Sequence, residues 1–216
     1  MHTGLIRFLL LLVSCLPTAW SADLQPGKDY EVLQPAQPTA QRDKIVVTEF
    51  FSYQCPHCYS FFPAVTSWVA KLPKDVVFER EAVSVGYKTW PPAAQTFYTL
   101  RAMGKLGELN NSLDGAIFSA IHKQGVRFAD RDGIAAWMAT QKINAKQFAS
   151  TFDSFGVQSA TAGGERLAKN HKVPSIPSIV IDGKYLVSIE DRPDYTPQLA
   201  KLDQLIAKAR AEKARR

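Results

Sequence analysis

The sequence predicts an α/β protein: a mixed β-sheet flanked by helices, with a separate block of helices inserted into it. Three observations indicate this class. An apolar run over 44–51 has the pattern of a strand buried on both faces, and a helix start follows it at once. A helical pattern without strands fills 86–171. A strand–turn–strand pattern over 179–189 and a last helix then complete the sheet-containing part.

We expect 23–85 and 172–216 to form the sheet-containing domain and 86–171 to form the inserted helical domain. A chain of 216 residues is long enough to bury a sizeable core, and its 46% hydrophobic and 21% charged residues are ordinary for a globular protein. Much of the formal charge of +6 lies at the C-terminal end. No basic face interleaved with aromatic residues appears, which argues against nucleic-acid binding.

Residues 1–22 have the features of a secretory signal peptide. Arg7 supplies the basic start, an apolar core over 8–13 follows, and small residues precede a cleavage point after Ser21, with Ala22 as the alternative. The apolar run is far shorter than the roughly 20 residues that a membrane-spanning helix needs. The segment therefore predicts export with cleavage.

A second interpretation of this segment involves Cys15. Residues 12–15 resemble a lipoprotein signal, in which Cys15 becomes the lipidated first residue of a membrane-anchored chain. Ordinary cleavage near Ser21 remains the main prediction. In that case only Cys55 and Cys58 stay in the mature protein, so no other thiol competes with them for disulfide formation.

Cys55 and Cys58 fall where the helix after the 44–51 strand should begin. Pro56 suits the first helical position, because its ring fixes a helical φ and its missing N–H is no loss there. Cys55 then lies at the N-cap, where unpaired N–H groups and the helix dipole favour a thiolate. The sequence therefore predicts a solvent-facing Cys55 with a low pKa, and a more buried Cys58 without one.

His57, between the two cysteines, can donate to the Cys55 sulfur or carry positive charge beside it. Favouring the Cys55 thiolate stabilises the dithiol form. The disulfide then becomes more oxidising by roughly 30 mV for each unit of pKa below ambient pH. Cys55, Pro56, His57 and Cys58 are therefore the predicted catalytic residues of a disulfide donor.

Two other interpretations of the cysteine pair remain open. A structural disulfide that closes a loop of about four residues would add only roughly 2 kcal/mol to stability. A zinc site would need a second pair of ligands, and neither His122 nor His171 has ligand spacing. The main prediction is a redox centre with no metal and no cofactor other than its own disulfide.

The segment Phe50-Phe51-Ser52-Tyr53-Gln54-Cys55-Pro56-His57-Cys58-Tyr59 resembles the active-site signature of the DsbA family of bacterial periplasmic thiol:disulfide oxidoreductases. The resemblance extends over essentially the whole chain after residue 23 and implies a thioredoxin-like fold with an inserted helical domain. It implies that Cys55 forms mixed disulfides with reduced, unfolded exported proteins in the periplasm. A DsbB-like, quinone-linked membrane oxidase would then reoxidise the pair. We expect the protein to be a monomer.

Glu49 is the one acidic residue in the apolar run 44–51. A buried carboxylate is either paired or protonated with a raised pKa. Glu49 is thus either a proton acceptor beneath the cysteines or half of a buried ion pair. In the DsbA family an acid at this spacing lies under the active site, which favours the first role. Arg80, in the strand predicted over 75–83, matches a basic position of that family and is the candidate partner.

The inserted block should break at 104–107, 124–125, Asp130 and Asn144, where glycine or capping residues occur. Its larger apolar residues suit the core of a small helical bundle. They are Ile117, Phe118, Ile121, Trp137, Met138, Phe148, Phe152 and Phe155.

The remaining elements complete the sheet and cover it. A short strand is expected over 30–33, and Asp182-Gly183 has the residues that a type I′ hairpin turn prefers. The last helix, over 196–211, has an apolar stripe that should cover one face of the sheet.

Pro177 directly precedes this hairpin. By resemblance to thioredoxin-like proteins, the Ile176–Pro177 bond is expected to be cis and to face the cysteines. The Val173–Pro174 bond does not match that position and is expected to be trans. The backbone of Ile176 would then present an N–H and a C=O to an extended substrate peptide, making Ile176 and Pro177 the predicted substrate-binding residues.

Two other functions remain as alternatives. A disulfide isomerase or reductant of the same fold would need a dimerisation region or a less oxidising dipeptide between the cysteines, and the sequence shows neither. A thiol-independent chaperone would use exposed aromatic residues, for which Tyr53, Tyr87 and Trp90 are the candidates.

Overall fold

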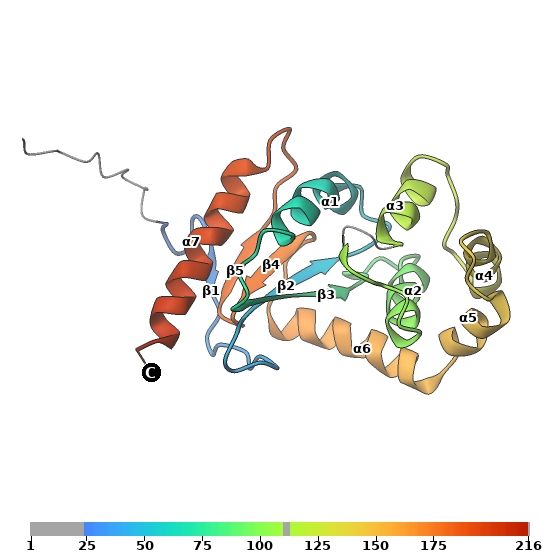
Figure 1. The fold of residues 1–216 in the computed structure, drawn as a ribbon, viewed down its shortest axis with the longest axis horizontal. Helices are drawn as coiled ribbons and strands as arrows, with labels where there is room; N and C mark the ends of the chain where they lie inside the picture. Colours follow the sequence, from blue (N-terminus) through green and yellow to red (C-terminus); the bar gives the residue numbers. More distant parts are fainter. Residues whose placement is uncertain (1–23, 110–112, 216) are drawn as a thin grey trace, which may run out of the picture.

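The computed structural model describes residues 24–109 and 113–215 (Figure 1). The predicted signal peptide over 1–22, with its alternatives at Cys15, Ser21 and Ala22, lies outside the described residues. In the part of the chain that the structure describes, no helix is both long enough and apolar enough to cross a bilayer.

A mixed five-stranded sheet forms the centre of the fold, as the sequence predicts. Its strands are β1 (Glu31–Val32), β2 (Ile45–Phe51), β3 (Val76–Ala82), β4 (Ser178–Ile181) and β5 (Tyr185–Ser188). They follow the spatial order β1-β5-β4-β2-β3, in which β2 and β3 are parallel and the other neighbours are antiparallel. The N-terminal and C-terminal parts of the chain therefore share one sheet.

Strand β2 is the central element. All seven of its residues are buried. It pairs with β3 on one side and with β4 on the other, which explains why it is apolar on both faces. In the register of β2 and β3, Glu49 lies opposite Arg80. The sheet thus brings the two predicted supporting residues together.

Helices cover both faces of the sheet (Figure 1). The helices are α1 (Pro56–Val69), α2 (Pro91–Ala102), α3 (Asp114–His122), α4 (Arg131–Thr140), α5 (Ala145–Phe152), α6 (Phe155–Asn170) and α7 (Thr196–Lys213). Apolar residues of α1 and α7 pack with one face of the sheet, whereas α2 and α6 pack with the other. The apolar cluster on the α2 and α6 side continues from the sheet into the helical block, so the block is joined to the sheet by a common core.

Side-chain caps start the later helices of the block where the sequence predicts breaks. The carboxylate of Asp130 accepts a hydrogen bond from the Gly133 N–H at 2.8 Å, and the amide oxygen of Asn144 accepts one from the Gln147 N–H at 2.9 Å. The prediction that Phe155 belongs to the core of the helical block is wrong. It is 84% exposed, because Ser154 caps α6 and leaves the first helical residue pointing to solvent.

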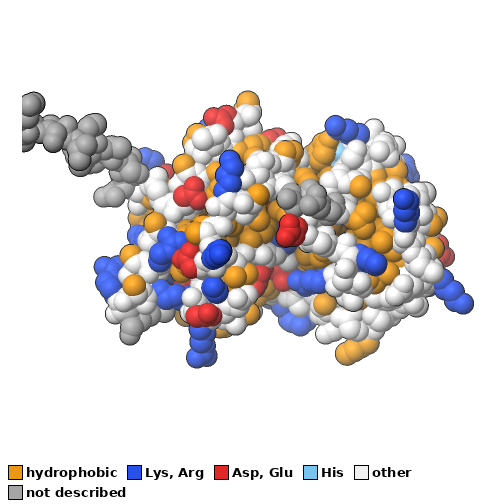
Figure 2. All heavy atoms as spheres, in the orientation of Figure 1, with side chains coloured by type: hydrophobic (Ala, Val, Ile, Leu, Met, Phe, Trp, Pro, Cys, Tyr) orange, Lys and Arg blue, Asp and Glu red, His pale blue; other side chains and the backbone are white. Residues whose placement is uncertain are grey.

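Basic and acidic side chains are interspersed on the face shown in Figure 2. Many basic groups are paired with nearby carboxylates. Arg210 and Asp75, for example, join α7 to the segment before β3, with Nε 2.5 Å from Oδ2. The positive charge of the C-terminal helix thus partly serves to fix this helix against the sheet.

The β4–β5 hairpin has the predicted type I′ turn. Asp182 and Gly183 have φ values of 51° and 64°, and the Lys184 N–H donates to the Ile181 C=O at 3.0 Å. Gly183 also touches a distant segment, since a Cβ built on it would lie 2.0 Å from the Gln37 carbonyl oxygen. Glycine is therefore required here both by the turn and by a close backbone approach.

We expect Gly183→Ala to destabilise the protein more than a positive φ alone explains. The left-handed conformation should account for about 1–2 kcal/mol of the loss in unfolding free energy. The clash with Gln37 adds to it. Gly125→Ala is the matched control, because Gly125 has a φ of 68° and a Cβ added to it would meet no atom within 4 Å. Urea unfolding at one redox state measures both, and equal losses would contradict the proposed clash.

Candidate functional site

The two cysteines lie where β2 ends and α1 begins. Cys55 is the N-cap of α1, with an extended backbone at φ −82° and ψ 118°, and Pro56 occupies the first turn. The Cys58 N–H donates to the Cys55 sulfur at 3.4 Å. Both residues are free thiols in this structure. The predicted helix start is therefore confirmed, and the sulfur of Cys55 performs the capping.

The pKa of the Cys55 thiol falls from 9.0 to about 7. The largest cause is a hydrogen bond from the Cys58 thiol, which burial opposes. Backbone N–H groups of Cys58 and His57 and the charge of His57 lower the pKa further. The predicted direction is confirmed. The sequence predicted the helix backbone and His57 as causes, and the structure adds the partner thiol of Cys58 as the largest one.

Cys58 behaves in the opposite way. It is 1% exposed, and burial is the first cause that raises the pKa of its thiol well above 9.0. Its hydrogen bond to Cys55 and the charge of Glu49 act in the same direction. When the pair is reduced, the single remaining proton therefore stays on Cys58 while Cys55 ionises.

The prediction that Cys55 faces solvent is wrong in this structure. Cys55 is only 3% exposed. The loop before β4 covers it, and the Cys55 thiol donates to the Ile176 carbonyl oxygen at 3.6 Å. Sequence reasoning placed Cys55 correctly on α1 but could not show that a segment 121 residues away closes over it.

The Ile176–Pro177 bond is cis and Val173–Pro174 is not, as predicted. The carbonyl of Ile176 is not free when Cys55 is protonated, because it accepts the Cys55 thiol hydrogen bond. Among the described residues, nothing accepts a hydrogen bond from the Ile176 N–H. The backbone of Ile176 thus lies directly beside the sulfur that is expected to react.

His57 is turned toward a carboxylate rather than being enclosed with the cysteines. Its side chain is 57% exposed, and its Nδ1 lies 3.0 Å from Oδ2 of Asp191 in the β5–α7 loop. Asp191 also accepts a hydrogen bond from the Tyr195 hydroxyl at 2.7 Å. Sequence reasoning missed this partner, because an acid in an exposed loop carries no signal of its own.

The predicted pairing of Glu49 with Arg80 is confirmed. Arg80 Nε donates to Glu49 Oε2 at 2.7 Å, and both side chains are more than nine-tenths buried. The guanidinium also lies over the Phe51 ring, 3.7 Å from its centroid. A buried arginine held in this way is an anchored charge beneath the cysteines.

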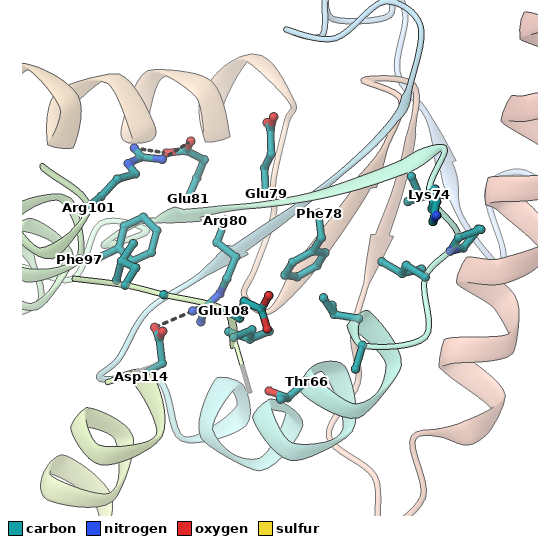
Figure 3. A pocket seen from close by; sticks show the side chains of 18 residues that line it. Thr66, Lys74, Phe78, Glu79, Arg80, Glu81, Phe97, Arg101, Glu108 and Asp114 are labelled. Atoms are coloured by element: carbon teal, nitrogen blue, oxygen red, sulfur yellow. Dashed lines mark hydrogen bonds and ion pairs between the residues drawn. The ribbon is translucent and has the colours of Figure 1, made fainter. Parts of the chain in front are cut away.

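A second carboxylate shares this arginine. Asp114, at the start of α3, accepts a hydrogen bond from Arg80 Nη1 at 2.6 Å (Figure 3). It accepts a second one from the Tyr53 hydroxyl at 2.5 Å. Tyr53 is fully buried, so the prediction that it is an exposed aromatic is wrong. Sequence reasoning missed Asp114, because an acid in the first turn of a helix usually indicates only a dipole interaction.

The network affects the protonation of Glu49. Burial is the main cause that raises the pKa of the Glu49 carboxyl, Arg80 opposes it, and the negative charge of Asp114 raises it again. One guanidinium between two buried carboxyl groups leaves an excess of negative charge when both are ionised. Glu49, the member whose charge also acts on Cys58, is therefore suited to hold a proton.

A cavity of about 800 Å³ lies on the other side of this network (Figure 3). It is lined by α1, β3, α2 and the 106–109 segment, and Arg80 and Asp114 form part of its wall. Neither cysteine lines it, so the redox chemistry does not take place there. In the described ranges 24–109 and 113–215, no group of three His, Cys, Asp or Glu side chains could hold a metal ion.

Comparisons with known proteins show which family the chain is similar to. A family model described as Thioredoxin matches residues 40–196. The thiol:disulfide interchange protein DsbA of Pseudomonas syringae pv. tomato is 40% identical over 190 residues, which cover 87% of this chain and 86% of that protein. The DsbA of Pseudomonas aeruginosa is 35% identical over 214 residues, 98% of each chain.

A solved structure shows the same fold. The crystal structure of Pseudomonas aeruginosa DsbA has a TM-score of 0.82 to this chain at 34% identity, and the match covers 91% of this chain and 99% of that one. The family model covers most of the chain, and the two curated relatives are matched over 86% and 98% of their length. The chain therefore belongs to the DsbA family of thiol:disulfide oxidoreductases, with a thioredoxin-like fold.

Proposed function

We propose that this oxidoreductase donates the Cys55–Cys58 disulfide to exported proteins as they fold in the periplasm. The observation that carries the proposal is the asymmetry of the two thiols. The pKa of Cys55 is lowered to about 7, whereas burial raises that of Cys58. A thiolate of low pKa is a good leaving group, so a mixed disulfide on Cys55 is readily released from it.

The transfer proceeds in two exchanges. A substrate thiolate attacks the Cys55 sulfur, the Cys55–Cys58 bond breaks, and its electron pair goes to Cys58, which takes up a proton. The second substrate thiolate then attacks the substrate sulfur of the mixed disulfide, and Cys55 leaves as a thiolate. Two electrons pass from the substrate thiols to the enzyme, and one disulfide is formed in the substrate.

Glu49 is the proposed source of the proton for Cys58. Its carboxyl group is buried, its pKa is raised, and its charge disfavours a Cys58 thiolate. A carboxyl group that gives its proton as the Cys58 thiolate appears avoids two buried negative charges at once. Arg80 and Asp114 hold Glu49 in place for this step.

Ile176 and Pro177 are the proposed contact for substrate backbone. Neither the disulfide nor the Cys55 thiolate carries an S–H, so in both states the Ile176 carbonyl loses the donor that occupies it when Cys55 is protonated. Both the N–H and the C=O of Ile176 can then pair with an extended peptide. Since main-chain pairing carries little side-chain information, substrates should be many and unrelated.

The cellular setting follows from the family. The relatives carry the name thiol:disulfide interchange protein DsbA. We propose a periplasmic protein, made with a signal peptide cleaved near Ser21 or Ala22, that acts as a monomer on reduced, unfolded exported proteins. A DsbB-like, quinone-linked membrane oxidase reoxidises it. No cofactor beyond the disulfide and no nucleic acid is needed for this cycle.

The first test of the proposed function is Cys55→Ala. We expect the variant to oxidise a reduced, unfolded substrate protein no faster than the uncatalysed reaction, as measured by loss of free thiols. A thiol-independent chaperone would instead keep suppressing aggregation in the variant. If the protein were an isomerase, the wild-type form would act faster on a substrate with scrambled disulfides than on a reduced substrate. Either of these results would contradict disulfide donation.

The pH dependence of stability is a second expected outcome. The folded pKa of Cys55, about 7, lies below the unfolded value of 9.0, so the unfolded dithiol chain binds more protons between these values. The unfolding free energy of the reduced form should therefore rise from about pH 7 to 9, by up to about 1.4 kcal/mol per pH unit, and this gain is lost as pH falls through 7.

The oxidised form serves as the reference, since its sulfurs do not titrate. Urea unfolding of both forms across this range isolates the contribution of the thiolate. A difference between the two forms that stays constant with pH would show that Cys55 ionises like an ordinary thiol.

Replacing Glu49 tests its proposed role in proton transfer. Glu49→Gln keeps the shape of the side chain and an oxygen for Arg80 but cannot supply a proton. We expect the reaction of the oxidised enzyme with a reduced peptide to slow by about tenfold or more in stopped-flow measurements. Glu79→Gln is the control. Glu79 projects from the face of β3 opposite to Arg80, the partner of Glu49 (Figure 3), so this variant should leave the rate unchanged. Equal rates in both variants would remove Glu49 from the mechanism.

A further inference from the structure

His57 has a partner that its place between the cysteines does not suggest. Its Nδ1 lies 3.0 Å from Oδ2 of Asp191, and the two side chains are 57% and 45% exposed. Asp191 belongs to the loop that joins β5 to α7, far along the chain from the Cys55–Cys58 motif. The fold thus places a carboxylate beside the imidazole of the redox motif.

Asp191 is itself held in place. The Tyr195 hydroxyl donates to its Oδ1 at 2.7 Å, and the Tyr195 ring packs on Phe61 of α1 with centroids 5.1 Å apart. Tyr195 is 8% exposed, so it anchors the carboxylate to the core. The hydrogen bonds from Tyr195 and His57 lower the pKa of Asp191, which keeps it ionised at neutral pH.

Other charges of the loop are directed elsewhere. Arg192 pairs with Glu190, with its Nε 2.9 Å from Oε2. Asp194 accepts a hydrogen bond from the Thr196 N–H at 2.8 Å, at the start of α7. Asp191 is thus the carboxylate of this loop that contacts the redox motif, and Arg192, the cation next to it in the chain, is engaged with Glu190 instead.

We propose that Asp191 is a positioning residue that moderates the oxidising strength of the disulfide by holding and neutralising His57. With Asp191 present, the Cys55 thiolate lies beside an imidazole that is turned toward a carboxylate. Without it, the thiolate lies beside a cation free to turn toward sulfur. This inference rests on the proposed role as a disulfide donor and adds the residue that sets how strong a donor it is.

The direction of the effect follows from the redox half-reaction. The disulfide takes up two electrons and one proton to give a Cys55 thiolate and a Cys58 thiol. Only the product carries negative charge on Cys55, so a positive charge nearby stabilises only the dithiol form. Removing the neutralising carboxylate should therefore lower the pKa of Cys55 further and make the disulfide more oxidising.

The test is the reduction potential of Asp191→Asn, measured by equilibrium with glutathione at about pH 8, where the Cys55 thiolate, with a pKa of about 7, is the main form of the reduced enzyme. Because the pair is exposed, we expect a shift of about two- to fivefold toward the dithiol form. Fivefold corresponds to about 20 mV. The pKa of Cys55, from thiolate absorbance, should fall to match. At about 1 M salt, where the Debye length is about 3 Å, the shift should largely disappear.

Four further variants make the result specific. Asp191→Glu keeps the charge and should restore most of the wild-type potential, while Asp194→Asn, in the same loop, should not change it. Tyr195→Phe, which releases the carboxylate, should shift the potential in the same direction as Asp191→Asn. In a His57→Ala background, Asp191→Asn should have no effect.

An unchanged or less oxidising disulfide in Asp191→Asn would overturn the inference, and so would a shift that persists without His57. These results are separate from the proposed function. A wild-type protein that is no stronger an oxidant than glutathione would contradict disulfide donation, whatever Asp191→Asn does.

Discussion

The helix start at Cys55 is the constraint on which the rest of the structure depends. The cysteine sulfur takes the place that a serine or aspartate oxygen usually fills at an N-cap, and it accepts the Cys58 N–H at 3.4 Å. A reactive sulfur in this position is stabilised as an anion by the helix that it begins. Strand β2 brings the chain to this point, and the burial of β2 between β3 and β4 fixes where the helix starts.

Two separate charge arrangements act on the two sulfurs. Beneath the pair, the buried Glu49–Arg80–Asp114 network links β2 and β3 to α3 of the helical block, and the Tyr53 hydroxyl joins it. Buried ion pairs contribute little to net stability, because the loss of hydration offsets their attraction. Their value here is placement, since they hold the carboxyl group that is proposed to give Cys58 its proton. At the surface, Asp191 and His57 act on Cys55, where solvent and salt reach the charges.

The loop at Ile176 explains how a nearly buried sulfur can still exchange disulfides. Only 3% of Cys55 is exposed, and its thiol, when protonated, is engaged with the Ile176 carbonyl. The same backbone that covers the sulfur is the segment proposed to pair with a substrate peptide. Coverage and substrate contact are therefore two states of one hydrogen-bonding position, and the presence or absence of the Cys55 proton distinguishes them.

The family resemblance, rather than a local signal, named Arg80 as the candidate partner of Glu49. The sequence by itself determined the sheet, the helix that begins at Cys55, the hairpin turn at Asp182 and the buried position of the acid Glu49. These features depend on local signals: apolar periodicity, a proline after a cap, two residues with positive φ, and one acid in a buried run. Only the tertiary structure decided that Ile176 covers Cys55, that Tyr53 is buried, and that Asp114 and Asp191 join the site. Each of these contacts links segments far apart in the chain, and the residues involved look like ordinary loop or helix-start acids until the fold brings them together.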